Sequence, residues 1–208
     1  GFITPLVPFA ERQNIIMNIC VYGASSNTIA YSYIAAGEEF GKKLAESGHS
    51  LICGGGANGM MGAFARGIKA KTGKIIGVVP SFLNVDGILF DGCTEMIYTE
   101  TMRERKQVME QKADAFLMTP GGIGTFDEFF EILTLKQLGR HKKPIAIFNV
   151  NGYFDSIIKM FDKAVKENFV PEKNLSLFFV SDNPQKITEY FENYVPDDFS
   201  PEFLKNIK

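Results

Sequence analysis

The hydrophobic pattern divides most of the chain into short apolar runs that alternate with longer amphipathic segments. The apolar runs predict six strands, at residues 18–25, 49–55, 74–79, 114–119, 144–150 and 175–181. The amphipathic segments predict helices near residues 28–47, 58–71, 102–112, 125–138, 154–168 and 184–193. Continuous apolar strands that alternate with helices are typical of a parallel sheet that is covered on both faces. We therefore predict the α/β class, with a doubly wound parallel sheet and helices on both faces.

The same pattern indicates one domain. Residues 15–208 contain no linker, low-complexity tract or fixed-period repeat, and residues 1–14 are expected to form a loose N-terminal arm. The first residues lack the basic start of a signal peptide, and their apolar run is broken by prolines and then by Glu11 and Arg12, so no membrane span is expected. Three cysteines without a CxxC pair suggest a reducing, cytoplasmic location.

Composition narrows the choice of ligands. The 208 residues are 45% hydrophobic and 22% charged, with a formal net charge of -2. A protein that binds nucleic acid normally carries a basic surplus for the phosphate backbone, so no nucleic-acid partner is expected. Any nucleotide would have to be held by local groups.

Three loops built from small residues follow predicted strands. They are GASSN at 23–27, GGGANG at 54–59 and PGGIGT at 120–125. Glycines bring backbone N–H groups close to a ligand, and the start of a helix adds partial positive charge. A single such loop could equally be the steric requirement of a tight turn. Three loops at one edge of the sheet favour a phosphate-bearing ligand.

The GGGANG loop also fits GxGxxG, which raises a dinucleotide hypothesis. The acidic residue that should bind the ribose about 20 residues further on is missing, since the next strand ends in VVP. A GxxxxGK[ST] sequence is absent as well. Binding of an NAD-type cofactor and P-loop chemistry are therefore disfavoured.

Glu128 has two interpretations. Thr125 and Glu128 have the T-x-x-E spacing of a capping box, in which both side chains bind free N–H groups at a helix start. On a helical wheel, however, Ile132 and Leu135 flank Glu128, and the rest of the helix is almost wholly apolar. A carboxylate on a buried helix needs a partner and is a candidate for function.

Arg105 is the candidate partner. It shares one helical stripe with Met102 and Met109, so an inward-facing row of methionines contains a guanidinium. The planar group suits a carboxylate or a phosphate. Lys106, the next residue, is expected to reach the same anion.

These motifs resemble the Lonely Guy (LOG) family. PGGIGTFDE is similar to its PGGxGTxxE signature and MRERK to its M-x-x-R-K element, and the likeness continues from VYGASS to NFVPEKN. The resemblance implies a homodimeric Rossmann-like nucleotide-binding domain that hydrolyses nucleoside 5'-monophosphates to free base and ribose 5-phosphate. Its substrates include AMP and cytokinin riboside monophosphates. Many members bear an older label, lysine decarboxylase, but nothing in this sequence resembles a pyridoxal-phosphate lysine site.

Carried over residue by residue, the resemblance implies that Arg105 and Glu128 are catalytic. It implies contacts to the nucleotide from Met102, Lys106, Gly121, Gly122, Ile123, Gly124, Thr125 and Thr134. Gly87 stands where many members have a glutamate, which leaves the base preference open, and Asp86 could substitute. No cofactor and no metal are expected, because His49 and His141 are not at ligand spacing; His141 is expected in a surface turn.

Two other classes of function remain open. Related folds include non-catalytic carriers of nucleotides or of the molybdenum cofactor, which would use the same glycine loops. A purely structural dimer is the third class. The presence of both Arg105 and Glu128 favours an enzyme, because a carrier could dispense with the pair. The apolar helix 126–138 would suit either the interface of a homodimer or the protein core.

Overall fold

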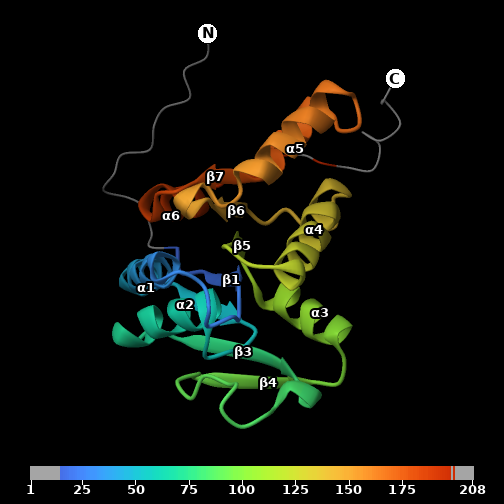
Figure 1. Cartoon of the computed structure of the whole chain (residues 1–208). Coiled ribbons are helices and arrows are strands. Elements are labelled where there is room, and N and C mark those ends of the chain that lie inside the picture. The colour runs from blue at the N-terminus through green and yellow to red at the C-terminus, as the bar shows by residue number, and fades with distance from the viewer. Residues whose placement is uncertain (1–14, 198, 200–208) are drawn as a thin grey trace.

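A computed structural model describes residues 15–197 and 199 (Figure 1). Its centre is a seven-stranded, all-parallel sheet in the order β4-β3-β2-β1-β5-β6-β7. The strands are β1 (Asn18–Tyr22), β2 (Ser50–Cys53), β3 (Ile75–Pro80), β4 (Glu95–Thr99), β5 (Ala115–Met118), β6 (Ile145–Phe148) and β7 (Phe179–Ser181). The helices are α1 (Tyr31–Glu46), α2 (Gly59–Ala70), α3 (Met102–Lys112), α4 (Ile123–Gln137), α5 (Asp155–Lys166) and α6 (Pro184–Glu192). The predicted fold class is confirmed.

Alternate residues of each strand face opposite layers of the core. In β1, Ile19 and Val21 pack with Phe40 and Phe64 of the layer formed by α1, α2 and α6. Cys20 and Tyr22 face the other layer, which contains residues of α3, α4 and α5 such as Phe129. Figure 1 shows α1 and α2 on the other side of the sheet from α3 and α4. Because both faces are covered, the strands read as continuous apolar runs.

The sequence pattern missed β4 and misplaced the start of β7. Strand β4 (EMIYT) lies at the edge of the sheet and is only half-buried, so its polar and apolar residues mix and no apolar run marks it. The predicted last strand at 175–181 begins only at Phe179, because Glu172–Leu177 forms a 3-10 helix. The predicted arm at 1–14 lies outside the described residues.

The order of the strands creates a switch point between β1 and β5. From β1 the chain winds through β2 and β3 to β4 in one direction, then returns to the other side of β1 with β5. At such a point the connections leave neighbouring strands in opposite directions, which opens a crevice beyond their carboxyl ends. The loops that follow β1 and β5 are GASSN and PGGIGT.

Two of the cysteines lie in the core of the protein. Cys20 and Cys53 are free and fully buried, and burial raises the pKa of the Cys53 thiol to about 12. Both therefore behave as small apolar side chains, as expected.

Within residues 15–197 and 199, we find no helix with the length and apolar character needed to cross a membrane.

His141 is not the surface-turn residue that the sequence suggested. Its Nε2 lies 2.8 Å from the carbonyl oxygen of Ile132, and its Nδ1 accepts the N–H of Lys143 at 3.2 Å. This arrangement requires the neutral ring with the proton on Nε2. Partial burial lowers the pKa of His141 to about 4. Burial also lowers the pKa of His49. The Nδ1 of His49 accepts the N–H of Met17.

We predict that the protein loses stability as the pH falls from about 6.5 to about 4. A histidine with a lowered pKa binds protons better in the unfolded chain, so its contribution is complete above the unfolded pKa and is lost below it. For His141 we expect a loss on the order of 1–2 kcal/mol, allowing for its partial exposure. Urea unfolding at several pH values measures this, with His141→Gln as the comparison. The variant should show a shallower slope, to which His49 still contributes because its pKa is also lowered. Equal slopes would contradict the assignment.

Candidate active site

The three glycine loops meet around one cavity, as the sequence predicted. The cavity has a volume of about 540 Å³ and lies at the carboxyl ends of β1, β2 and β5. Its lining includes Gly23–Ser26 after β1, Gly54 and Gly56 after β2, and Gly122–Thr125 after β5. Leu83, Ile88, Leu89 and Met102 form an apolar wall. The lining of the cavity therefore combines backbone N–H groups with apolar side chains.

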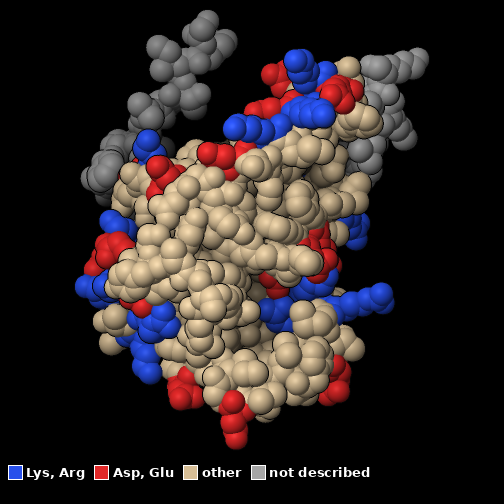
Figure 2. Space-filling view, in the orientation of Figure 1, with Lys and Arg blue, Asp and Glu red and all other residues tan. Residues whose placement is uncertain are grey.

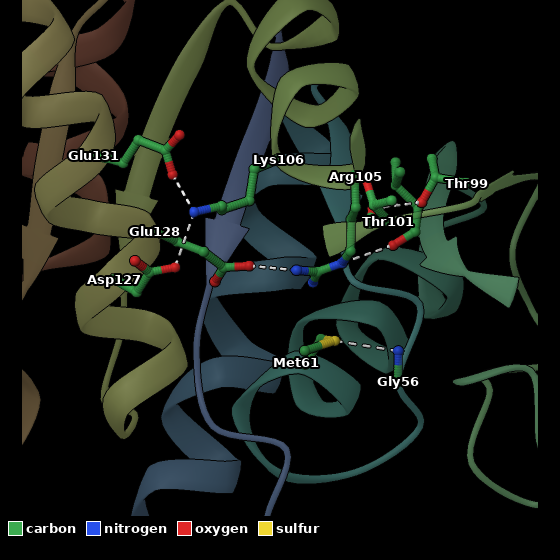
Figure 3. Close-up of polar contacts among 10 residues, drawn as sticks. Gly56, Met61, Thr99, Thr101, Arg105, Lys106, Asp127, Glu128 and Glu131 are labelled. Atoms are coloured by element: carbon green, nitrogen blue, oxygen red, sulfur yellow. Dashed lines mark hydrogen bonds and ion pairs between the residues drawn. The ribbon is translucent and has the colours of Figure 1, made fainter. Parts of the chain in front are cut away.

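Arg105 and Glu128 form an ion pair in the wall of this cavity (Figure 3). Arg105 Nη1 donates to Glu128 Oε1 at 2.6 Å, and Arg105 Nε donates to the carbonyl oxygen of Val78 at 3.0 Å. The two side chains are only 8% and 11% exposed. The helical stripe on α3 thus predicted correctly that Arg105 points inward and meets a carboxylate.

The environment of Glu128 acts on its pKa in two directions. Burial raises the pKa of Glu128, while the charge and hydrogen bond of Arg105 lower it. The effect of burial is larger, so the net direction is upward. A carboxyl group with a raised pKa is closer to accepting and releasing a proton at neutral pH.

The proposed capping box at Thr125 and Glu128 is wrong. Helix α4 begins two residues earlier than predicted, at Ile123, with Gly122 as its N-cap and no side-chain cap. Glu128 therefore lies in the second turn, too far along the helix to cap it. A T-x-x-E box exists instead on α3, where Thr101 accepts the N–H of Glu104 at 3.1 Å and Glu104 accepts the N–H of Glu100 at 2.8 Å. This box fixes the start of the helix that carries Arg105.

The early start of α4 leaves a row of free donors at the cavity. The first bond of the helix runs from Phe126 N–H to the carbonyl of Gly122. In the described part of the chain, the N–H groups of Ile123, Gly124 and Thr125 have no acceptor. The start of a helix with free N–H groups and partial positive charge is suited to an anion.

The structure separates the predicted site residues into groups. Seven line the cavity of the glycine loops: Met102, Arg105, Gly122, Ile123, Gly124, Thr125 and Glu128. Gly121 is not among the lining residues, and its carbonyl oxygen accepts the hydroxyl of Tyr153. Lys106 and Thr134 line a second cavity along α4, of about 820 Å³, which shares Ile123 and Asp127 with the first. There Lys106 donates to Asp127 at 3.0 Å and contacts Glu131. Figure 3 shows Lys106 between Asp127 and Glu131, and Figure 2 shows basic and acidic side chains close together in the region where α3 and α4 lie.

Sequence reasoning missed the residues that hold Arg105 and the second glycine loop in place. A Cβ atom on Gly54 would overlap with the Arg105 guanidinium, so this position needs glycine. Met61 Sδ accepts the N–H of Gly56 at 3.1 Å and fixes the loop beside it (Figure 3). The Gly54–Arg105 contact joins distant parts of the chain, so no local residue pattern signals it. The bond between Gly56 and Met61 is local and spans five residues, but it depends on the conformation of the loop.

Metal ligation has no support among residues 15–197 and 199. Nowhere in these ranges do three His, Cys, Asp or Glu side chains gather in a way that could hold a metal ion.

Comparison with known proteins finds relatives over most of the chain. A family model described as "Possible lysine decarboxylase" matches residues 61–191. Cytokinin riboside 5'-monophosphate phosphoribohydrolase LOG2 of Arabidopsis thaliana is 35% identical over 191 residues, which cover 91% of this chain and 90% of the relative. The LOG enzyme of Oryza sativa subsp. japonica is 36% identical over 187 residues, covering 90% of this chain and 77% of the relative.

Solved structures resemble the fold at lower identity. The molybdenum cofactor binding protein of Rippkaea orientalis superposes with a TM-score of 0.64 at 20% identity, over 84% of this chain and 94% of that chain. The Moco carrier protein of Chlamydomonas reinhardtii gives a TM-score of 0.62 at 22% identity, over 84% and 95%. At this identity the likeness concerns the fold alone.

We predict that Arg105→Ala destabilises the protein by about 3 kcal/mol at pH 7.5, because it leaves a buried carboxylate without its partner. In the variant the pKa of Glu128 should rise further, since Arg105 lowers it. A carboxyl group with a higher pKa in the folded chain stabilises the fold as the pH falls. Urea unfolding at pH 7.5 and 5.5 should therefore show a smaller loss at the lower pH.

The control for this experiment is the double variant Arg105→Ala, Glu128→Gln, which removes both charges. It should be more stable at pH 7.5 than Arg105→Ala alone and show no such gain at pH 5.5. If Arg105→Ala were as stable as the wild type at pH 7.5, the pair would not be a buried ion pair in solution.

Proposed function

Because this chain belongs to the LOG family of phosphoribohydrolases, we propose that it hydrolyses the N-glycosidic bond of a nucleoside 5'-monophosphate. The products are the free base and ribose 5-phosphate. The substrate is AMP or an N6-modified AMP such as a cytokinin riboside monophosphate. The observation that carries the proposal is the buried Arg105–Glu128 pair, which lies in the same cavity as the free N–H groups at the start of α4.

The cavity suggests how the nucleotide lies. The 5'-phosphate takes the N–H groups of Ile123, Gly124 and Thr125, which lack other acceptors in the described residues. The base takes the apolar lining, against Leu83 and Ile88. In this proposed orientation the ribose lies between the phosphate and the base, next to Glu128.

Glu128 and Arg105 then have distinct roles. Water attacks C1' of the ribose while the C1'–N bond breaks, and positive charge develops on the sugar ring as in other glycoside hydrolyses. The Glu128 carboxylate stabilises that charge and takes a proton from the attacking water. The bonding electron pair leaves with the base nitrogen, which takes up a proton from solvent, and Glu128 then releases its own proton to solvent. Arg105 orients the carboxylate and keeps it ionised in its buried position.

The alternative of a non-catalytic carrier is less well supported. The carriers are about 20% identical to this chain, whereas the phosphoribohydrolases are about 35% identical. A carrier also has no need of a buried carboxylate with a raised pKa beside its ligand. The ion pair is costly to bury and is explained by a reaction that uses it.

The preference for a base depends on the loop around Gly87. Gly87 has a positive φ of 78° with open space around it, and Asp86 and Gly87 line a neighbouring cavity of about 320 Å³. This position offers the base no side chain, whereas Leu83 and Ile88 offer apolar ones. We infer that an apolar N6 substituent contacts Leu83 and Ile88, and that AMP lacks these contacts.

The test is to incubate the protein separately with AMP and with N6-isopentenyl-AMP and to separate the products by chromatography. We expect release of free base and ribose 5-phosphate, with the higher kcat/KM for the N6-modified nucleotide. Glu128→Gln should lower kcat about a hundredfold or more while nucleotide binding is kept, because a positioned acid-base group is lost.

Glu110→Gln provides the control. Glu110 lies on α3 and lines neither the glycine-loop cavity nor the second cavity along α4. The turnover of Glu110→Gln should equal that of the wild type. Near-normal turnover of Glu128→Gln would refute the role of Glu128. Binding without release by the wild type would favour the carrier.

We also propose that the protein is a homodimer through the outer side of α4. Ile123 is 87% exposed and Phe130 is 42% exposed, and both line the cavity of about 820 Å³ with Phe126 and Leu135. Large apolar side chains gathered on one face mark an interaction surface. The charged residues beside them, Arg103 and Glu131, supply the mixed polar rim of such an interface.

Light scattering should therefore give about twice the chain mass of 23.1 kDa. Phe130→Asp should shift the protein to the monomer at micromolar concentration, because a charge on the interface would lose its water. Phe169→Asp is the matched control, since Phe169 is 79% exposed but lies outside this cavity. A wild-type monomer, or equal effects of the two substitutions, would contradict the dimer.

A further inference from the structure

Tyr153 makes one hydrogen bond to the loop between β5 and α4. Its hydroxyl donates to the carbonyl oxygen of Gly121 at 2.7 Å. Tyr153 comes from the connection between β6 and α5, next to the 3-10 helix Val150–Gly152. The bond therefore joins the glycine loop to a segment about thirty residues further along the chain.

The segment that carries Tyr153 is held in place by its own contacts. Asn149 Nδ2 donates to Asp155 at 2.8 Å, and Asn149 Oδ1 accepts the N–H of Phe154 at 2.7 Å. The Tyr153 ring packs edge-on against Phe154, with 4.9 Å between the ring centroids, and against Tyr33 of α1, with 5.9 Å between the centroids. The ring thus has a fixed position from which its hydroxyl reaches Gly121.

The hydrogen bond fixes the direction of a donor in the cavity. In a trans peptide the carbonyl oxygen and the following N–H point in opposite directions. Tyr153 holds the Gly121 carbonyl on the side of β6 and α5, so the N–H of Gly122 is directed away from Tyr153. Gly122 lines the cavity, and its N–H has no acceptor among the described residues.

The peptide between Gly121 and Gly122 has little orientational preference of its own. Two adjacent glycines have little steric preference, so the backbone alone does not select one orientation. The neighbouring peptide is fixed independently, because Pro120 accepts the N–H of Ala24 at 3.0 Å. The carbonyl group of Gly121 follows that of Pro120 in the chain, and it accepts a hydrogen bond from the side chain of Tyr153.

We propose that Tyr153 is a positioning residue for the phosphate of the substrate, acting through the Gly121–Gly122 peptide. This inference rests on the proposed function, in which that phosphate lies at the start of α4. The Tyr153 hydroxyl itself points to the loop and takes no part in breaking the glycosidic bond. Its loss weakens binding of the phosphate and leaves the Arg105–Glu128 pair intact.

The experiment compares Tyr153→Phe with Tyr33→Phe. Each substitution removes one hydroxyl and keeps the ring contact between the two residues, but the Tyr33 hydroxyl makes no hydrogen bond within residues 15–197 and 199. For Tyr153→Phe we expect KM for AMP and Kd for ribose 5-phosphate to rise about five- to tenfold, the effect of one lost hydrogen bond. The value of kcat should change less than twofold. Tyr33→Phe should match the wild type in all three, and the thermal midpoint of each variant serves as a check on folding.

The outcomes distinguish this inference from the proposed function. Active wild type with an unchanged KM and Kd in Tyr153→Phe would overturn the role of Tyr153 alone. A lowered kcat at constant KM would overturn it too, since the residue would then act on the reaction. A wild type that binds ribose 5-phosphate without hydrolysing AMP would refute the proposed reaction, while the Kd comparison would still decide on Tyr153. A wild type that neither hydrolyses AMP nor binds ribose 5-phosphate would overturn both.

Discussion

The buried ion pair between Arg105 and Glu128 is the interaction on which the arrangement of the site depends. Each charge has lost most of its water, so either one alone would be strongly destabilising. The pair therefore fixes α3 against α4, although the two helices follow different strands. Other features serve the same geometry: the carbonyl of Val78 takes the Nε of Arg105, glycine at position 54 leaves room for its guanidinium, and Thr101 fixes the start of α3.

The strand order of the sheet places this pair next to the glycine loops. Helix α4 follows β5 and the GASSN loop follows β1, and the strand order makes these two strands neighbours. The start of α4, with its free N–H groups, therefore lies beside the first glycine loop, and Glu128 lies one and a half turns further along the same helix. A phosphate site and a carboxylate on one rigid helix have a fixed separation. Rigid spacing of this kind is what positions a ribose 5-phosphate relative to a reacting group.

The sequence predicted the elements better than their ends. Buried strands and the stripe of Met102, Arg105 and Met109 leave a clear periodic pattern, so the fold class and the inward direction of Arg105 could be predicted. Strand β4 leaves none, because an edge strand is only half-buried. The start of α4 was misplaced because its N-cap is Gly122, whereas Thr125 offered a better capping pattern. His141 looked like a turn residue, and only the tertiary fold shows that both ring nitrogens are engaged.

The position of Lys106 shows why spacing alone cannot assign partners. It follows Arg105 in the chain, yet a step of one residue turns a helical side chain by about 100°. Arg105 therefore faces Glu128, while Lys106 faces Asp127 and Glu131. In this arrangement the groups nearest the proposed phosphate are backbone N–H groups and a neutralised ion pair. Neutral, fixed donors bind an anion through direction as well as charge, so the orientation of each peptide in the loop, including the one that Tyr153 holds, determines how well the phosphate fits.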